Sequence, residues 1–156
     1  MTAPQPSPTT RPAAAADGAL YDAVAAEHAT IYGYGVVSAH TTPDTNELVS
    51  ESMAEHRRRR EAALAMLSAR AAGAPLPEPG YQLPMTVHDP ADAARLAIQM
   101  EEDDAVAWRA VVEQATDESD RAFAVTALTE CAVRAARWRK VLGTTPVTVA
   151  FPGGAE

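Results

Sequence analysis

A run of prolines in the middle of the chain restricts its fold more than any other feature. Residues 74–90 contain five of them, which are Pro75, Pro77, Pro79, Pro84 and Pro90. Proline lacks a backbone N–H and clashes with the preceding helical turn, so this stretch cannot form a helix. It is also longer than an ordinary connection between packed elements. The sequence therefore predicts a long extended connection at the centre of the chain.

Alanine-rich segments with helical spacing lie on both sides of this connection. The 156-residue chain is 47% hydrophobic but only 5% aromatic, and alanine is the strongest helix former. Capping and breaking residues predict helices over about 17–39, 45–72 and 89–115, and a fourth from the turn at 116–118 to about 142. We therefore expect an all-α domain built from two antiparallel helical hairpins, with one long crossover between the second and third helices.

The two ends of the chain differ in composition from the helical part. Residues 1–16 are rich in Pro, Thr and Ala and are predicted to form a disordered arm. Residues 17–143 form the predicted helical bundle. Residues 144–156 are predicted to be an extended C-terminal tail, whose alternating Val147, Val149 and Phe151 would pack along the bundle or onto a partner chain.

Charge and cysteine content argue against several classes of protein. The net charge of −8 and the pI near 4.9 argue against a protein that binds nucleic acid through phosphates. The run from Arg57 to Arg60 is interpreted as a solvated helix segment, in which only Arg60 shares a face with His56. Cys131 is the single cysteine, which excludes an intramolecular disulfide and a thiolate zinc site. With no signal-peptide core and no membrane-spanning stretch in the sequence, we expect a cytoplasmic protein.

Three polar residues interrupt the apolar stripes of the expected helices. Glu27 lies among Leu20, Val24, Ile31 and Tyr34. His56 and Glu101 interrupt the stripes of the second and third helices in the same way. At about 100° per residue, each points within roughly 30° of the centre of its stripe. Ionisable groups rarely face a core unless they are paired or bind a metal.

Hairpin geometry places these three residues near one level of the bundle. Glu27 precedes a turn near residue 42 by almost the same length of chain as His56 follows it. Glu101 precedes the second turn, near residue 117, by a similar length of chain. The corresponding level on the fourth helix falls at Ala132 and Val133, which offer no ligand.

The motifs on these helices resemble part of the ferritin-like pattern. Glu27-x6-Tyr34 resembles the first-helix Glu-x6-Tyr of that superfamily, and Glu101 matches the glutamate of its third helix. The superfamily also carries Glu-x-x-His on the second and fourth helices, where i and i+3 side chains share a face. The corresponding positions here are Met53-x-x-His56 and Glu130-x-x-Val133, so one glutamate and one histidine are missing.

A narrower resemblance covers about residues 18–153. Residues 26–35, 56–60, 107–109 and 150–153 are similar to an uncharacterised, alanine-rich ferritin-like domain family of high-GC bacteria. This resemblance implies a ferritin-like antiparallel four-helix bundle and a homodimer. It implies no settled activity, and any catalytic residues stay unknown.

Two functions remain open from the residues. In the first, Glu27, His56 and Glu101 bind a single metal ion, with Fe(II), Mn(II) or Zn(II) suited to this donor set. In the second, the protein is a metal-free structural or interaction bundle, and its buried carboxylates pair with His56, Arg60 or Arg134. Whether the protein is an enzyme is left open. Asp103 and Asp104 are interpreted as a solvated acidic face, and Trp108 and Trp138 as core.

Overall fold

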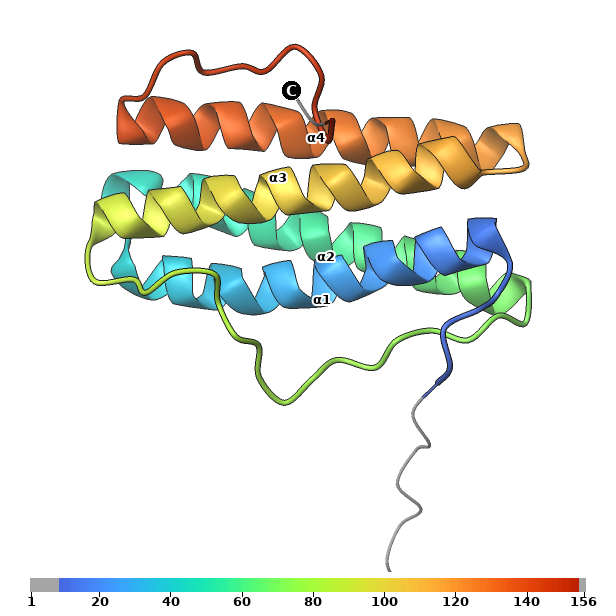
Figure 1. Cartoon of the computed structure of the whole chain (residues 1–156). Coiled ribbons are helices and arrows are strands. Elements are labelled where there is room, and N and C mark those ends of the chain that lie inside the picture. Colours follow the sequence, from blue (N-terminus) through green and yellow to red (C-terminus); the bar gives the residue numbers. More distant parts are fainter. Residues whose placement is uncertain (1–8, 155–156) are drawn as a thin grey trace, which may run out of the picture.

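The computed structural model describes residues 9–154, within which four long α-helices lie side by side and no strand occurs (Figure 1). They are α1 (Ala15–His40), α2 (Asn46–Ala69), α3 (Pro90–Gln114) and α4 (Glu118–Leu142). A single 3₁₀ turn, η1 (Pro43–Thr45), lies between α1 and α2. The predicted all-α class is confirmed, and no helix within 9–154 is long and apolar enough to cross a membrane.

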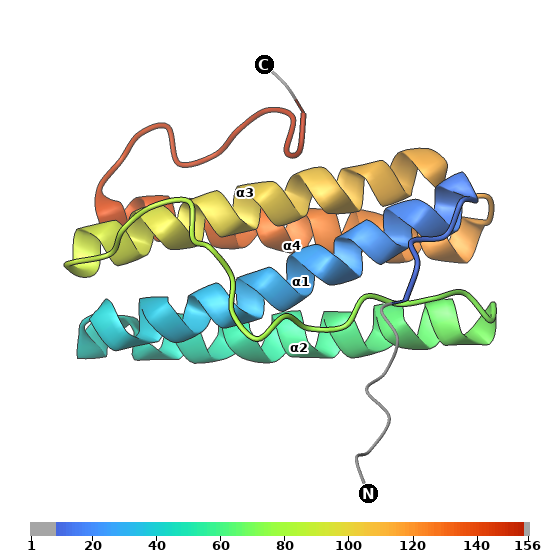
Figure 2. The same ribbon diagram turned by 60° about the horizontal axis from the view of Figure 1, so that its bottom comes forward.

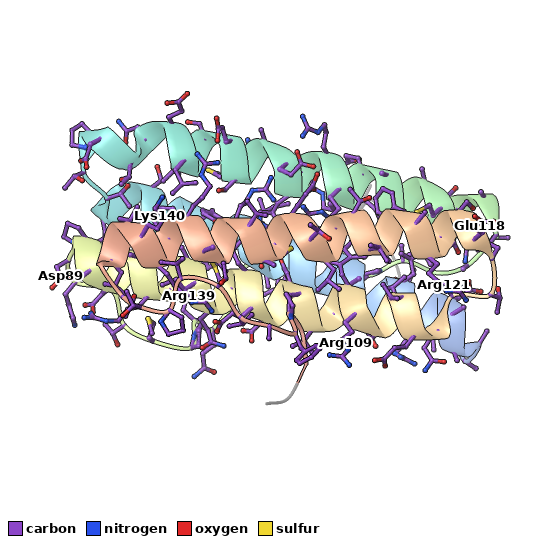
Figure 3. The ribbon with its side chains drawn as sticks, turned by 90° about the horizontal axis from the view of Figure 1, so that it is seen from above. Asp89, Arg109, Glu118, Arg121, Arg139 and Lys140 are labelled. Carbon is purple, nitrogen blue, oxygen red and sulfur yellow. The ribbon has the colours of Figure 1, made fainter. Side chains whose placement is uncertain are left out.

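Local signals in the sequence explain most of the helix ends. The carboxylate of Asp89 accepts a hydrogen bond from the backbone N–H of Asp92 at 2.8 Å, and Pro90 opens α3. Asp117 caps α4 in the same way, at 2.9 Å from the N–H of Asp120. Gly143 ends α4 in the left-handed conformation, with φ 76°. Figure 3 shows Asp89 at the start of α3, and Glu118 and Lys140 near opposite ends of α4.

Two helix boundaries differ from the expectation. Helix α1 begins at Ala15, so Asp17 lies in its first turn rather than at the N-cap, and its carboxylate pairs with Arg70 at 3.2 Å. Helix α2 ends at Ala69 rather than near residue 72, because Ala71 adopts a positive φ of 51°.

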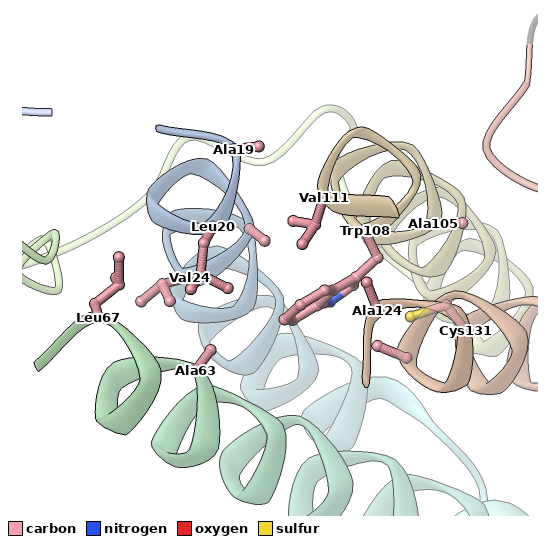
Figure 4. Packing of buried hydrophobic residues seen from close by; sticks show 12 residues of the cluster. Ala19, Leu20, Val24, Ala63, Leu67, Ala105, Trp108, Val111, Ala124 and Cys131 are labelled. Atoms are coloured by element: carbon pink, nitrogen blue, oxygen red, sulfur yellow. The ribbon is translucent and has the colours of Figure 1, made fainter. Parts of the chain in front are cut away.

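Two apolar clusters fill the space between the helices. One gathers around Trp108 and contains Leu20, Val24, Ala63 and Leu67 among others. Figure 4 shows the indole of Trp108 reaching from α3 into the centre of this cluster. The second contains Tyr34, Val37, Leu96 and Trp138. Along α1, α2 and α3 the polar residues Glu27, His56 and Glu101 lie between the two clusters, so the core contains a polar layer.

Three non-helical segments lie against the helices. The connection after α2 runs back along them before α3 begins (Figures 1 and 2), and its Tyr81 ring lies 5.5 Å from that of Tyr32. The described part of the predicted N-terminal arm contacts α1, where Arg11 pairs with Asp22 at 2.7 Å; residues 1–8 lie outside the described range. The C-terminal tail returns along α3 and α4 (Figure 1), and its Val147 carbonyl accepts a hydrogen bond from Arg139 at 3.0 Å.

Candidate functional site

The structure brings the three sequence-predicted polar residues into contact in the polar layer. Glu27, His56 and Glu101 are each 0% exposed. Nδ1 of His56 lies 2.7 Å from Oε2 of Glu27, and Nε2 lies 3.0 Å from Oε1 of Glu101. The imidazole therefore bridges a carboxylate from α1 and a carboxylate from α3. These contacts do not test whether Glu27, His56 and Glu101 bind a metal ion, so metal binding by this set stays a prediction.

Asp104 joins this cluster, contrary to the sequence interpretation. It was expected on a solvated acidic face, but it is fully buried, and Oδ2 lies 3.3 Å from Nδ1 of His56. Asp104 follows Glu101 by three residues, so both carboxylates lie on the inner face of α3. Its neighbour Asp103, about 100° away around the helix, is exposed as expected.

Arg59, rather than Arg60, is the arginine that enters the core. One guanidinium nitrogen of Arg59 donates to Oε1 of Glu27 at 3.1 Å and to Sγ of Cys131 at 3.3 Å. The other terminal nitrogen donates to Oε2 of Glu130 at 2.7 Å. Arg60 instead pairs with the adjacent Glu61 near the surface. Arg59 and His56 are separated by three residues and so share a face of α2.

Two indoles and one phenol complete the surroundings of the carboxylates. Nε1 of Trp108 donates to Oε1 of Glu27 at 2.7 Å. The hydroxyl of Tyr34 donates to Oε1 of Glu101 at 2.5 Å, and Nε1 of Trp138 donates to that hydroxyl at 3.0 Å. The two tryptophans are buried as predicted, and each also holds a polar group in place.

Some polar atoms of the cluster have no hydrogen-bond partner within the described chain. They are Oδ1 and Oδ2 of Asp104 and Oε2 of Glu101. Buried carboxylate oxygens without a partner are costly, so they indicate either a bound cation or a bound proton. The Asp104 carboxyl group is the strongest case. It is fully buried, and its polar neighbours are the Thr30 hydroxyl, which lowers its pKa, and the ring of His56, 3.3 Å from Oδ2.

The surroundings shift the ionisation of these groups in different directions. Burial alone would lower the pKa of His56, but the facing carboxylates of Glu101 and Glu27 outweigh it and raise the pKa to about 10. Burial raises the pKa of Glu27, but hydrogen bonding to His56 and the charge of Arg59 outweigh it, so the net pKa is lowered. Burial and the nearby charge of Glu27 hold the pKa of Asp104 well above its usual range.

The arrangement has the donor atoms of a metal site. Glu27, His56 and Asp104 each offer one ligand atom, and these atoms all lie within 4.8 Å of one another. This group contains two of the three ligands predicted from the sequence, and Glu101 lies on the other side of the imidazole.

The fourth helix supplies no further ligand to this group. Val133, the position of the missing histidine, is 54% exposed and faces solvent. Glu130 is half-exposed and turned toward Arg59. Cys131 accepts a hydrogen bond from Arg59, and burial raises the pKa of its thiol well above the usual value. The described side chains of α4 therefore do not replace the histidine that is missing at Val133.

Comparison with known proteins identifies relatives whose role is not assigned. The chain is 57% identical to a conserved hypothetical protein, rv2844, from Mycobacterium tuberculosis, whose crystal structure superposes with a TM-score of 0.82. The match covers 84% of this chain and 99% of that one. Among curated proteins, no significant match to the chain is found. A family model described as a domain of unknown function (DUF4439) matches residues 19–156, and the chain belongs to that family.

Proposed function

We propose that this protein binds one divalent metal ion through Glu27, His56 and Asp104. The buried carboxyl group of Asp104 carries the proposal. The Thr30 hydroxyl and the ring of His56 approach it, but no arginine, lysine or backbone N–H of the described residues does, so a carboxylate there needs a further counter-charge. Neither Arg59 nor a backbone N–H donates to it among the described residues. A metal ion placed against His56 and Glu27 would satisfy it.

The separations between these donors suit a shared ion. Nδ1 of His56 lies 2.7 Å from Oε2 of Glu27 and 3.3 Å from Oδ2 of Asp104. Two ligand atoms at about 2.1 Å from one ion and at right angles to each other lie about 3.0 Å apart. Two carboxylates and one imidazole suit Fe(II), Mn(II) or Zn(II). When bound, such an ion supplies Lewis-acid chemistry.

Glu101 has a separate part in this proposal. Its Oε1 lies against Nε2 of His56, the ring nitrogen that faces away from Asp104. A carboxylate that accepts the second ring N–H of a ligating histidine fixes its tautomer and orientation. Tyr34 and Trp138 in turn hold that carboxylate through successive hydrogen bonds. The sequence-based alternative, in which Glu101 is itself a ligand, stays a prediction that the experiment below decides.

The fold we propose is a ferritin-like antiparallel four-helix bundle with a long crossover between α2 and α3. The course of the ribbon supports it, since the chain reverses between α1 and α2 and again between α3 and α4 (Figure 1). The connection between α2 and α3 travels the length of the helices, as one long crossover would (Figures 1 and 2).

Metal content of purified variants tests the proposed function. Protein prepared without chelator, and apo-protein loaded anaerobically with Fe(II), Mn(II) or Zn(II), is expected to hold one ion per chain by elemental analysis. Asp104→Asn and His56→Gln are expected to lose it, because each removes a ligand. Glu113→Gln is the control, since it removes a carboxylate from an exposed position on α3 and leaves the donor set intact.

Glu101→Gln separates the two ligand sets. If Glu101 only orients His56, this variant retains the ion with an affinity weakened about 10–100-fold. If Glu101 is a ligand, it loses the ion as Asp104→Asn does. Wild-type protein that holds no ion after loading with all three metals would overturn the proposed function.

One observation favours a metal-free alternative. His56 is bracketed by Glu27 and Glu101, and Arg59 also pairs with Glu27, so internal cations neutralise much of the cluster. In this alternative Asp104 is protonated, and the protein is a structural bundle that acts through self-association or a partner. The predicted homodimer is compatible with both functions. Light scattering coupled to size-exclusion chromatography gives the molar mass in solution and so tests the dimer.

A further inference from the structure

A cavity of about 500 Å³ lies beside the buried cluster. Helices α1 and α3 form its walls, and residues 81–84 of the long connection cover it. Figure 2 shows this connection passing over α1 on its way to α3. The cavity therefore lies where the connection crosses the line between the two helices.

Small side chains on α1 keep this cavity open. Ala26 and Ala29 line it from α1, three residues apart and so on one face of the helix. Larger side chains at these two positions would fill the space between α1 and residues 81–84. The cavity is therefore a direct result of the alanines at these positions.

Two neighbouring carboxylates line the cavity at different depths. Asp103 is exposed, whereas Asp104 is fully buried, and both line the same space. Asp104 is also the residue whose two carboxylate oxygens have no hydrogen-bond partner. The cavity thus borders both Asp103, which is exposed, and Asp104, whose carboxylate oxygens are shielded from solvent.

A second cavity near the cluster is separated from it by a buried arginine. It measures about 280 Å³ and lies between α2 and α4, and its lining contains Arg58 and Arg59 together with their partners Glu55 and Glu130. The guanidinium of Arg59 stands between this space and Glu27. A positive charge at that point repels an approaching cation.

We propose that the α1–α3 cavity is the route by which a divalent cation reaches the buried carboxylates, with Asp103 as the outer carboxylate that attracts it. This inference rests on the proposed metal-binding function. Glu27, His56 and Asp104 are all 0% exposed, so an ion must pass through the protein to reach them. The net charge of −8 adds a general attraction for cations, which Asp103 concentrates at the cavity.

Stopped-flow mixing of apo-protein with Co²⁺ tests the route, with tryptophan fluorescence as the signal. The Trp108 indole donates to Glu27, so ion binding at the cluster changes its surroundings. Ala29→Leu is expected to lower the association and dissociation rates together by about tenfold, with the equilibrium affinity nearly unchanged, because it narrows the passage and leaves the ligands intact. Ala25→Leu, on the same helix and also half-buried, does not line the cavity and is the matched control.

A second variant tests the outer carboxylate without filling the cavity. Asp103→Asn is expected to lower the association rate about two- to fivefold and to weaken its dependence on salt. Glu113→Gln removes the same charge from another exposed position on α3 and is expected to leave the rate near that of wild type.

The outcomes separate the two proposals. If wild-type protein binds Co²⁺ and neither Ala29→Leu nor Asp103→Asn changes the rates relative to their controls, the route is wrong and the metal site stands. A folded Ala29→Leu that loses affinity through faster dissociation alone also overturns the route. If wild-type protein binds neither Co²⁺ nor any of Fe(II), Mn(II) and Zn(II) at equilibrium, both proposals are wrong.

Discussion

Replacing Arg59 with alanine is expected to lower the free energy of unfolding of the metal-free protein by about 3–5 kcal/mol. The guanidinium is 2% exposed and donates to Glu27, Glu130 and Cys131. Its removal leaves the Glu27 carboxylate buried beside two other carboxyl groups and with one fewer cation. Urea denaturation at pH 7 in the presence of chelator measures the change.

Arg58 provides a matched control for this prediction. It is the preceding residue in the same run of four arginines, its side chain is 73% exposed, and its partner is Glu55 on the same helix. Arg58→Ala is expected to change the free energy of unfolding by no more than about 0.5 kcal/mol. If Arg58→Ala and Arg59→Ala lower the free energy of unfolding equally, the loss comes from a property that both positions share, such as helix propensity, and not from the buried ion pair.

The metal-free protein is expected to lose stability as the pH rises from 7 to 8.5. The pKa of His56 is raised to about 10 in the folded state, above its unfolded value near 6.5. A raised histidine pKa stabilises the fold fully below the unfolded pKa, and this contribution is lost as the pH rises through the folded pKa. His56 alone therefore gives a loss of about 2 kcal/mol over this interval. The raised pKa of Asp104 acts in the same direction.

Two comparisons assign this pH dependence to the buried cluster. His88→Gln changes an exposed histidine and is expected to leave the slope unchanged, whereas His56→Gln is expected to reduce it. Saturating metal should reverse the trend, because ligands must lose protons to bind an ion and metal affinity rises with pH. A flat profile for the metal-free wild-type protein would contradict a protonated His56 in the fold.

Helical periodicity was enough to predict that Glu27, His56 and Glu101 meet. Each lies on the apolar stripe of its helix, and the positions of the two short turns set their levels. The rotation and the rise per residue of an α-helix are nearly constant. The position of a residue on the stripe therefore predicts the direction of its side chain, and its distance in sequence from the turn predicts its level along the helix. The four helices could be predicted for the same reason, since proline, glycine and capping aspartates punctuate them.

Asp104 and Arg59 were assigned to the wrong surroundings because each stands in a run of like residues. Asp103 and Asp104 look alike in sequence, and only the spacing of three from Glu101 indicates that Asp104 faces inward. Within the arginine run, Arg59 and Arg60 follow His56 by three and four residues, so both lie near its face of α2, and the prediction that only Arg60 shares that face is wrong. Which arginine enters the core depends on the rotation of α2 against α4, and the sequence of α2 alone does not set this rotation.

The long connection at residues 70–89 has a consequence for how the two parts of the molecule depend on each other. Glu27 and His56 precede it, whereas Glu101 and Asp104 follow it, so the helices before it and the helices after it each contribute two of these four residues. Ion pairs such as Arg59–Glu130 and Arg137–Glu51 join α2 to α4. An ion bound at the cluster would therefore act as a cross-link between the two pairs of helices. Part of its binding energy would hold the two halves of the chain together.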